Sequence, residues 1–253
     1  GWSMQKANEI WSWIEPFAAY GFNKSHSASY AVVSYQTAYM KANYPVEFMA
    51  SVMTAESGDE DKIYAAVEEC SSLGIQVLPP DVNESLGDFT VVDSKTIRFG
   101  LSAIKNLGSD VITKIIEIRE TTGKGFDSLQ DFLNRGTAKN FNKRSWEALV
   151  KGGALDRFGE RGQLLANTEF ILEFLRDKVK SENSGQNSLF GNSAFGDIKL
   201  QPAAPATKED MLGWEKEHLG MYVSAHPLDT YKQVLKSFNR VRALNELRDD
   251  QQV

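Results

Sequence analysis

A short polar loop near residue 25 carries the residue types of an anion site. It reads Asn23-Lys24-Ser25-His26-Ser27 and lies just before a predicted helix. Free amides at a helix N-terminus, together with the positive end of the helix dipole, bind phosphate groups. The lysine and the histidine would add charge and donors. A well-capped surface turn would use the same residues, so the residue types fit a phosphate without demanding one.

The middle third of the chain is basic, although the net charge of the whole chain is −6. Residues 95–163 hold 13 Lys and Arg against 8 Asp and Glu, whereas residues 1–94 hold 4 against 13. Because ions screen charges beyond roughly 8 Å, a phosphate backbone would respond to this local excess. The basic region is therefore where we expect nucleic-acid contacts.

Two segments of the basic region read as helix, tight turn, helix, with glycine at each turn. Such a turn lets a backbone approach a phosphodiester, and the following helix points unpaired amides at its oxygens. The pattern predicts tandem helix–hairpin–helix units that bind duplex DNA without reading bases; two helical hairpins that merely pack together would look the same. The predicted contacts are Lys105, Leu107, Gly108 and Lys114, then Lys143, Arg144, Lys151, Gly152 and Gly153.

An apolar pair stands inside the polar stretch 181–197, whose composition is typical of a flexible segment. Leu189 and Phe190 could enter a pocket on a partner protein while Gln186 forms hydrogen bonds at its edge. Burying the two side chains contributes roughly 3–6 kcal/mol, and ordering the segment removes part of that gain. We predict a weak peptide ligand made of Gln186, Ser188, Leu189 and Phe190; a chance match in a linker is the alternative.

Two other features are predicted to be structural. Asp59 and Asp61 have the spacing of a metal-binding pair, but they open a predicted helix, where carboxylates cap amides and offset the dipole. Cys70 is the only cysteine, which excludes an intramolecular disulfide and fits a reducing cytoplasm. Its neighbours give no reason for a lowered pKa, so we expect a buried thiol. We expect neither a metal site, nor a membrane span, nor a signal peptide.

Hydrophobic periodicity predicts a mainly α-helical fold with a small antiparallel β element. We expect helices over Met4–Ala18, over a stripe from Ala28 to Ala42 whose tyrosines enter the core, and over Gly58–Leu73. A short helix between the last two should bury Met49 and Met53.

Farther along, short β-branched runs between Gly74 and Phe99 predict the β element, with Pro79-Pro80 at its edge. Ser109 is the expected cap of the second helix in the first hairpin unit. We expect one helix from about Gly162 to Lys178, and an exposed His218 in a helical segment after Lys208.

Five stretches of the chain resemble one protein family. The longest is YGFNKSHSASYAVVSYQTAYMKANYPVEFMASVMTAES, and GIQVLPPDVNES, IRFGLSAIKNLG, LVKGGALDRFG and LGMYVSAHPLD follow in the family's order. They resemble the bacterial DNA polymerase III alpha subunits, the family C replicative polymerases, over nearly the whole chain. The pentapeptide QNSLF resembles the motif by which bacterial replication proteins bind the β sliding clamp.

The resemblance implies four regions. Residues 1–78 would be the C-terminal part of a multi-helix fingers domain, and 79–180 a small β element plus the tandem helix–hairpin–helix region. Residues 181–207 would be a flexible segment with the clamp-binding motif, and 208–253 a helical segment leading to an oligonucleotide-binding barrel.

The resemblance also assigns a role to the polar loop near residue 25. Asn23, Lys24, Ser25 and His26 would contact the incoming deoxynucleoside triphosphate and the primer–template. The palm domain, with its metal-binding aspartates and Mg²⁺, would lie upstream of Gly1. We therefore expect no catalytic residue and no bound cofactor in this segment, and no polymerase activity from it alone.

The implied function is template-directed DNA synthesis, to which this segment would contribute nucleotide contacts, duplex binding and a clamp tether. The implied partners are the β sliding clamp, double-stranded primer–template DNA, deoxynucleoside triphosphates and other replicase subunits, in the bacterial cytoplasm at the nucleoid. The alternative is a stand-alone helix–hairpin–helix scaffold that is tethered to the clamp but handles no nucleotide. The two differ at Lys24 and His26, for which a scaffold has no use.

Overall fold

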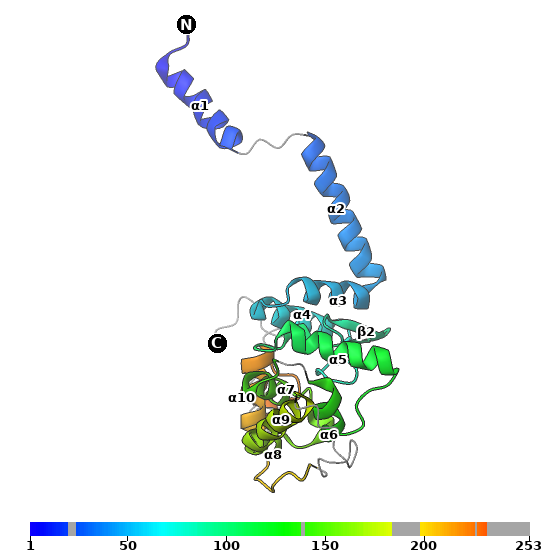
Figure 1. Cartoon of the computed structure of the whole chain (residues 1–253). Helices are drawn as coiled ribbons and strands as arrows, with labels where there is room; N and C mark the ends of the chain where they lie inside the picture. The colour runs from blue at the N-terminus through cyan, green and yellow to red at the C-terminus, as the bar shows by residue number, and fades with distance from the viewer. Residues whose placement is uncertain (20–23, 138–139, 184–197, 226, 232–253) are drawn as a thin grey trace. The chain divides into compact units, whose positions relative to one another are not determined.

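The computed structural model describes residues 1–19, 24–137, 140–183, 198–225 and 227–231 (Figure 1). The fold is mainly helical with one small sheet, as predicted. The chain divides into two compact units, Gly1–Phe48 and Met49–Val253. None of the described helices combines the length and the apolar character needed to cross a bilayer.

The first unit holds α1 (Met4–Ala19), α2 (Lys24–Asn43) and the start of α3 (Pro45–Ala55). The prediction that the tyrosines of α2 enter the core is wrong for this chain, because Tyr35 is 71% exposed and Tyr39 49%. No residue of α2 is buried. Helical periodicity predicted the helix correctly, but it did not show whether the apolar stripe is buried.

The second unit holds the end of α3 and all remaining elements. Met49 and Met53 of α3 are fully buried, as predicted. The α-helices that follow are α4 (Glu60–Ser72), α5 (Ser109–Thr122), α6 (Leu129–Asp131), α7 (Lys143–Lys151), α8 (Arg161–Ala166), α9 (Thr168–Asn183) and α10 (Lys208–Leu219). The short helical turns are η1 (Leu101–Ala103), η2 (Phe132–Gly136), η3 (Asp156–Phe158) and η5 (Pro227–Tyr231).

The sheet contains β1 (Gln76–Leu78), β2 (Thr90–Asp93) and β3 (Thr96–Arg98), in the order β1-β3-β2. It is mixed rather than purely antiparallel, because β1 pairs with β3 in parallel and β2 pairs with β3 antiparallel. After β1 the chain crosses to the far edge before the β2–β3 hairpin brings β3 into the centre. This crossover allows the parallel pair, and the double proline follows edge strand β1, as expected.

The core of the second unit centres on α7, which packs against α8, α9 and α10. Trp146 of α7 is fully buried, and its ring N–H donates to Thr168 Oγ1 at 3.1 Å. The other large, fully buried side chains are Phe99, Phe132, Ile97, Leu101, Ile104, Ile115, Leu133, Leu149 and Leu155, together with the two methionines of α3.

The single helix predicted from about Gly162 is interrupted at Asn167, which separates α8 from α9. The Asn167 side chain accepts from the Gln201 backbone N–H at 2.8 Å and donates to the Gln201 carbonyl at 3.0 Å. The non-helical segment 198–206, which we call the strap, therefore lies against α8. The Ala206 N–H donates to Glu160 Oε1 at 2.8 Å, and Thr207 then caps α10.

Candidate nucleic-acid interface

The first predicted hairpin lies between η1 and α5. Its first helix is a single 3-10 turn rather than a full helix. Asn106 has a φ of 68°, and it is the one non-glycine residue with positive φ in the described ranges; asparagine tolerates this conformation. Gly108, rather than Ser109, is the N-cap of α5, and no side chain caps it. In the first turn of α5, Ser109 and Asp110 are exposed, whereas Val111 and Ile112 are buried and their N–H groups donate to the Gly108 carbonyl at 3.1 and 3.2 Å. The Asp110 carboxylate lies beside Gly108 at this helix end.

Arg144, which belongs to the second helix–hairpin–helix unit, forms a hydrogen bond with this hairpin. Its guanidinium donates to Asn106 Oδ1 across 38 residues of sequence. Arg144 lies in the first turn of α7, whose N-cap Asn142 accepts from the Arg144 and Ser145 amides. The fold therefore brings Arg144, a predicted contact of the second helix–hairpin–helix unit, beside Leu107 and Gly108 of the first helix–hairpin–helix unit.

The predicted lysines surround the same region with different partners. Lys105 forms an ion pair with Glu60, and Lys143 forms one with Glu169 at 3.0 Å. The hydrogen bond to Glu169 raises the pKa of Lys143. Lys151, at the end of α7, is half-buried, and Lys114 lines an open groove between α5 and η2. Exposed ion pairs are weak, so a phosphate could compete for Lys105 and Lys143.

The arginines of the basic region mostly bind their own chain, which charge counting did not reveal. Arg119 donates to the carbonyls of Val82 and Ser85, and Arg157 pairs with Asp81 and Glu84. Burial, the largest cause, lowers the pKa of Arg119. Part of the excess positive charge of residues 95–163 therefore stabilises the fold and is not presented to a partner.

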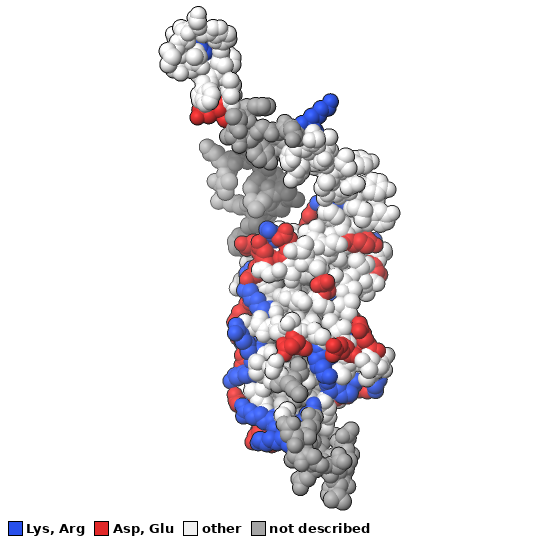
Figure 2. Space-filling view, turned by 45° about the horizontal axis from the view of Figure 1, so that its top comes forward, with Lys and Arg blue, Asp and Glu red and all other residues white. Residues whose placement is uncertain are grey.

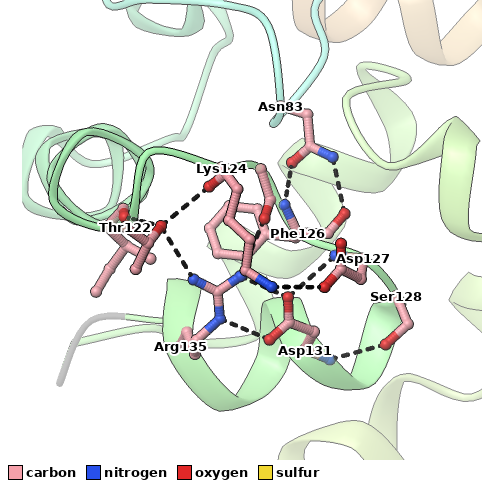
Figure 3. Close-up of polar contacts among 10 residues, drawn as sticks. Asn83, Thr122, Lys124, Phe126, Asp127, Ser128, Asp131 and Arg135 are labelled. Carbon is pink, nitrogen blue, oxygen red and sulfur yellow. Dashed lines mark hydrogen bonds and ion pairs between the residues drawn. The ribbon is translucent and has the colours of Figure 1, made fainter.

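Arg135 is the clearest example (Figure 3). It donates from Nε to Asp131 Oδ1 at 2.6 Å and from Nη2 to the Gly125 carbonyl at 3.0 Å, and its guanidinium lies 5.0 Å from the centroid of the Phe126 ring. Asn83 accepts from the Phe126 N–H and donates to the Phe126 carbonyl, both at 2.8 Å. These contacts hold the connection between α5 and α6 against the loop after β1.

The second glycine turn differs from our prediction. Gly152 and Gly153 are both buried. A Cβ on Gly152 would lie 2.9 Å from the Ala148 carbonyl and 3.3 Å from Ile104 Cγ2, and one on Gly153 would overlap the Arg161 guanidinium. These glycines permit close packing inside the chain, and their N–H groups donate to the carbonyls of Ala148 and Val150 at 2.9 and 3.0 Å. Their contact with a phosphate stays a prediction.

His218 was expected to be exposed and is buried, with 4% of its surface accessible. It lies at the C-terminal end of α10, where its carbonyl accepts from the Lys105 N–H at 2.9 Å. Neither ring nitrogen makes a hydrogen bond. Burial, the largest cause, lowers the pKa of His218. The sequence offered no signal for this contact, because the two residues are far apart in the chain.

The polar loop near residue 25 is described only in part, since Asn23 lies outside the described residues. Lys24, Ser25 and His26 form the first turn of α2 rather than a loop before it. Lys24 and Ser25 are exposed, and the His26 ring lies 4.4 Å from the Tyr30 ring. Lysine and hydroxyl side chains therefore lie in the first turn of a helix, and the binding of an anion there stays a prediction.

The predicted clamp ligand, Gln186, Ser188, Leu189 and Phe190, lies outside the described residues. The described chain resumes at Ile198, whose N–H donates to Gln130 Oε1 at 3.3 Å.

The carboxylates that resemble a metal pair serve as a helix cap. Asp59 Oδ1 accepts from the Lys62 N–H at 3.3 Å and is the N-cap of α4, as predicted. Within the described ranges, no group of three or more His, Cys, Asp or Glu side chains could hold a metal ion. Cys70 is fully buried, which confirms the prediction of a buried thiol, and burial raises the pKa of the thiol to about 11.

Charged side chains of both signs share the face drawn in Figure 2. Lys and Arg side chains lie along the left margin and again at the lower right, and Asp and Glu side chains lie among them.

Comparisons with known proteins agree with this geometry. The helix–hairpin–helix motif family matches residues 74–164, a range that runs from before β1 into α8. It includes the hairpin at Asn106, both glycine turns and Arg144.

Relatives that match nearly the whole chain carry one name, DNA polymerase III subunit alpha. The one from Borreliella burgdorferi is 42% identical over 98% of this chain and 22% of its own length. The one from Thermus aquaticus is 48% identical over 90% of this chain and 18% of its own length. The one from Xylella fastidiosa is 39% identical over 93% of this chain and 20% of its own length. The chain spans about a fifth of these relatives, and over that segment it belongs to the DNA polymerase III alpha subunit family.

Proposed function

We propose that this chain is a segment of a DNA polymerase III alpha subunit, a DNA-directed DNA polymerase, and that its main task is to hold the primer–template duplex. The observation that carries the proposal is the hairpin at Asn106. It has an uncapped helix N-terminus, it contacts Arg144 of the second unit, and it lies in the part of the chain that matches the helix–hairpin–helix family.

The duplex would be held by its sugar–phosphate backbone. The Ser109 and Asp110 amides of α5 would bind phosphate oxygens, and Lys105, Lys114, Lys143, Arg144 and Lys151 would supply charge. Gly108 is exposed, with the Asp110 carboxylate beside it, whereas Gly152 and Gly153 contribute by shaping the second turn. None of these contacts reads a base edge, so the binding would be independent of sequence.

The remaining parts of the proposal rest on the family resemblance. Lys24, Ser25 and His26, together with Asn23, would contact the nucleoside triphosphate and the primer–template. The segment with Gln186, Ser188, Leu189 and Phe190 would bind the β sliding clamp, and other replicase subunits would join it in the bacterial cytoplasm at the nucleoid. Mg²⁺ would be held by a palm domain of the longer protein.

Charge reversal tests duplex binding. Replacing Lys143, Arg144 and Lys151 by glutamate should weaken binding to a primed duplex and flatten its salt dependence. Each lost phosphate contact lowers the slope of log affinity against log salt by roughly 0.9, so a loss of about 2 to 3 in slope is expected from fluorescence anisotropy at several salt concentrations.

The control reverses three lysines that are not among the predicted DNA contacts. Lys6→Glu, Lys62→Glu and Lys124→Glu replace exposed side chains that are paired with acids, and the change in net charge is the same as in the test variant. This variant should keep most of the slope. An equal loss of slope in both variants would mean that total charge, rather than the hairpin region, attracts the duplex.

The stand-alone scaffold is the second candidate, and the relatives favour it less. It predicts that Lys24→Ala has no effect on nucleotide incorporation when it is placed in the complete polymerase. A raised KM for the nucleotide, or slower incorporation, would instead support the polymerase reading.

A further inference from the structure

Helix α10 lies outside the residues that match the helix–hairpin–helix family, yet it contacts both hairpins. Its C-terminal carbonyl at His218 accepts from the Lys105 N–H at 2.9 Å. Carbonyls in the last turn of a helix have no partner within the helix, so this contact satisfies both groups. At the second hairpin, Leu219 Cδ2 lies 3.5 Å from the position that a Cβ on Gly152 would occupy.

A buried ion pair fastens α10 to the second hairpin. Glu215 of α10 is 1% exposed, and its Oε1 lies 3.0 Å from Arg161 Nη1. Arg161 also pairs with Asp156 at 2.7 Å, and its guanidinium fills the space beside Gly153. Removing one partner of such a pair leaves an uncompensated buried charge.

The second oxygen of Glu215 holds the chain that leaves α10. Its Oε2 accepts from the N–H groups of Val223 and Ser224, both at 2.9 Å. One carboxylate therefore connects the second hairpin, α10 and the residues after it. Glu215 and Arg161 are 54 residues apart in the sequence.

The shape of the first hairpin depends on the same helix. Lys105 directly precedes Asn106, whose positive φ must be supported by its surroundings. If α10 is displaced, the Lys105 N–H loses its acceptor, and the turn that contains Gly108 loses a hydrogen bond that holds its backbone.

We propose that α10 is a third element of the duplex-binding site and that Glu215 is its positioning residue, holding both hairpins in the geometry that meets the phosphate backbone. The inference rests on the proposed duplex binding. It predicts a change in duplex affinity opposite to the electrostatic expectation, because removing an acidic side chain from a DNA-binding protein should by electrostatics alone strengthen binding. Removing Glu215 should weaken it.

The experiment compares Glu215→Gln with Glu209→Gln in the 253-residue chain. Glu209 is exposed in the first turn of the same helix, so the two variants lose the same charge. Duplex affinity is measured by fluorescence anisotropy, and the exchange of the Lys105 amide by hydrogen–deuterium exchange. We expect Glu215→Gln to raise Kd about fivefold or more, in the range of couplings between sites, and to speed Lys105 exchange. Glu209→Gln should leave exchange unchanged and keep or slightly tighten binding.

The outcomes separate the two proposals. If the unaltered chain does not bind the duplex, the proposed function is wrong, while Lys105 exchange still shows whether Glu215 holds the hairpin. If the unaltered chain binds and Glu215→Gln binds equally well with unchanged exchange, the role of α10 is wrong. If Glu215→Gln loses its helical circular dichroism signal, Leu219→Ala replaces it, and unchanged affinity and exchange in that folded variant would overturn the proposal.

Discussion

At the residue scale, the arginines of the basic region show that a charge excess in sequence is not a charge excess on the surface. Arg119, Arg135 and Arg157 are bound by carboxylates and carbonyls of their own chain. Arg144 differs, because its guanidinium donates to the side-chain oxygen of Asn106 in the hairpin rather than to a carboxylate or to the main chain. Arg144 is the one arginine among the predicted DNA contacts, and its binding to DNA stays a prediction.

Asp131 carries a testable prediction at this scale. Its pKa is lowered chiefly by the hydrogen bond from Arg135, and both side chains are less than a quarter exposed. Asp131→Asn should reduce the free energy of unfolding by about 1–2 kcal/mol at pH 7, as measured by urea denaturation. Because the folded pKa lies below the unfolded value of about 3.9, this contribution is present above pH ~4 and disappears as pH falls through the folded pKa.

The control for this prediction is Asp127→Asn. The Asp127 side chain is 72% exposed and pairs with exposed Lys124. Its loss should change stability by less than about 0.5 kcal/mol. A pH-independent difference between Asp131→Asn and the unaltered chain would contradict the ionic explanation.

At the element scale, the strap shows how a non-helical segment is held against a helix. Gly162 in α8 lets the strap approach, since a Cβ there would lie 2.5 Å from the Ala206 nitrogen and 2.8 Å from the Ala204 carbonyl. Burial would raise the pKa of Glu160, but hydrogen bonds from Gly162, Ala206 and Gln163 lower it overall. The strap is therefore an ordered connection that ends where α10 begins.

Gly162→Ala should displace the strap. We expect a loss of about 1–3 kcal/mol in the free energy of unfolding, as for overpacked sites, and faster exchange of the Gln201 amide that Asn167 accepts. Gly213→Ala in α10 is the matched control, since a Cβ there meets nothing within 4 Å. It should be neutral or stabilising by up to about 1 kcal/mol. Equal stability of the two variants would show that the strap is not tightly seated.

At the scale of the whole molecule, the proposed clamp ligand falls in the sequence between α9 and the strap. Linking a weak peptide contact to a duplex-binding surface raises the effective concentration of each partner for the other. A contact that is weak alone would thereby become strong on clamp-loaded DNA.

Leu189→Ala with Phe190→Ala tests this tether. The pair should abolish capture of the chain by purified β sliding clamp in a pull-down, while duplex affinity stays within about twofold, because the apolar side chains that fill the pocket are lost and the hairpins are untouched. Phe195→Ala, an apolar change in the same stretch but outside the pentapeptide, should leave capture intact. Undiminished capture of the double variant would remove the motif from the clamp interface.

Local chemistry let the sequence alone determine much of this protein. The helical stripes, the burial of Met49, Met53 and Cys70, and the role of Asp59 as a helix cap follow from the order of neighbouring residues. The cap of α5 does not, since Gly108 rather than Ser109 takes that place. The family resemblance was also available from the sequence, because it resides in stretches of consecutive residues.

Tertiary structure decided what depends on residues far apart in the chain. Such contacts determine the parallel pairing of β1 with β3 and the burial of Gly152 and Gly153. They also determine the position of His218, whose carbonyl accepts from the Lys105 N–H. The tyrosines of α2 make the same point in reverse, because a periodic stripe says which side chains share a face but not whether another element covers it. A polar or apolar group is buried only where another element packs on it, and the fold of the whole chain determines which element that is.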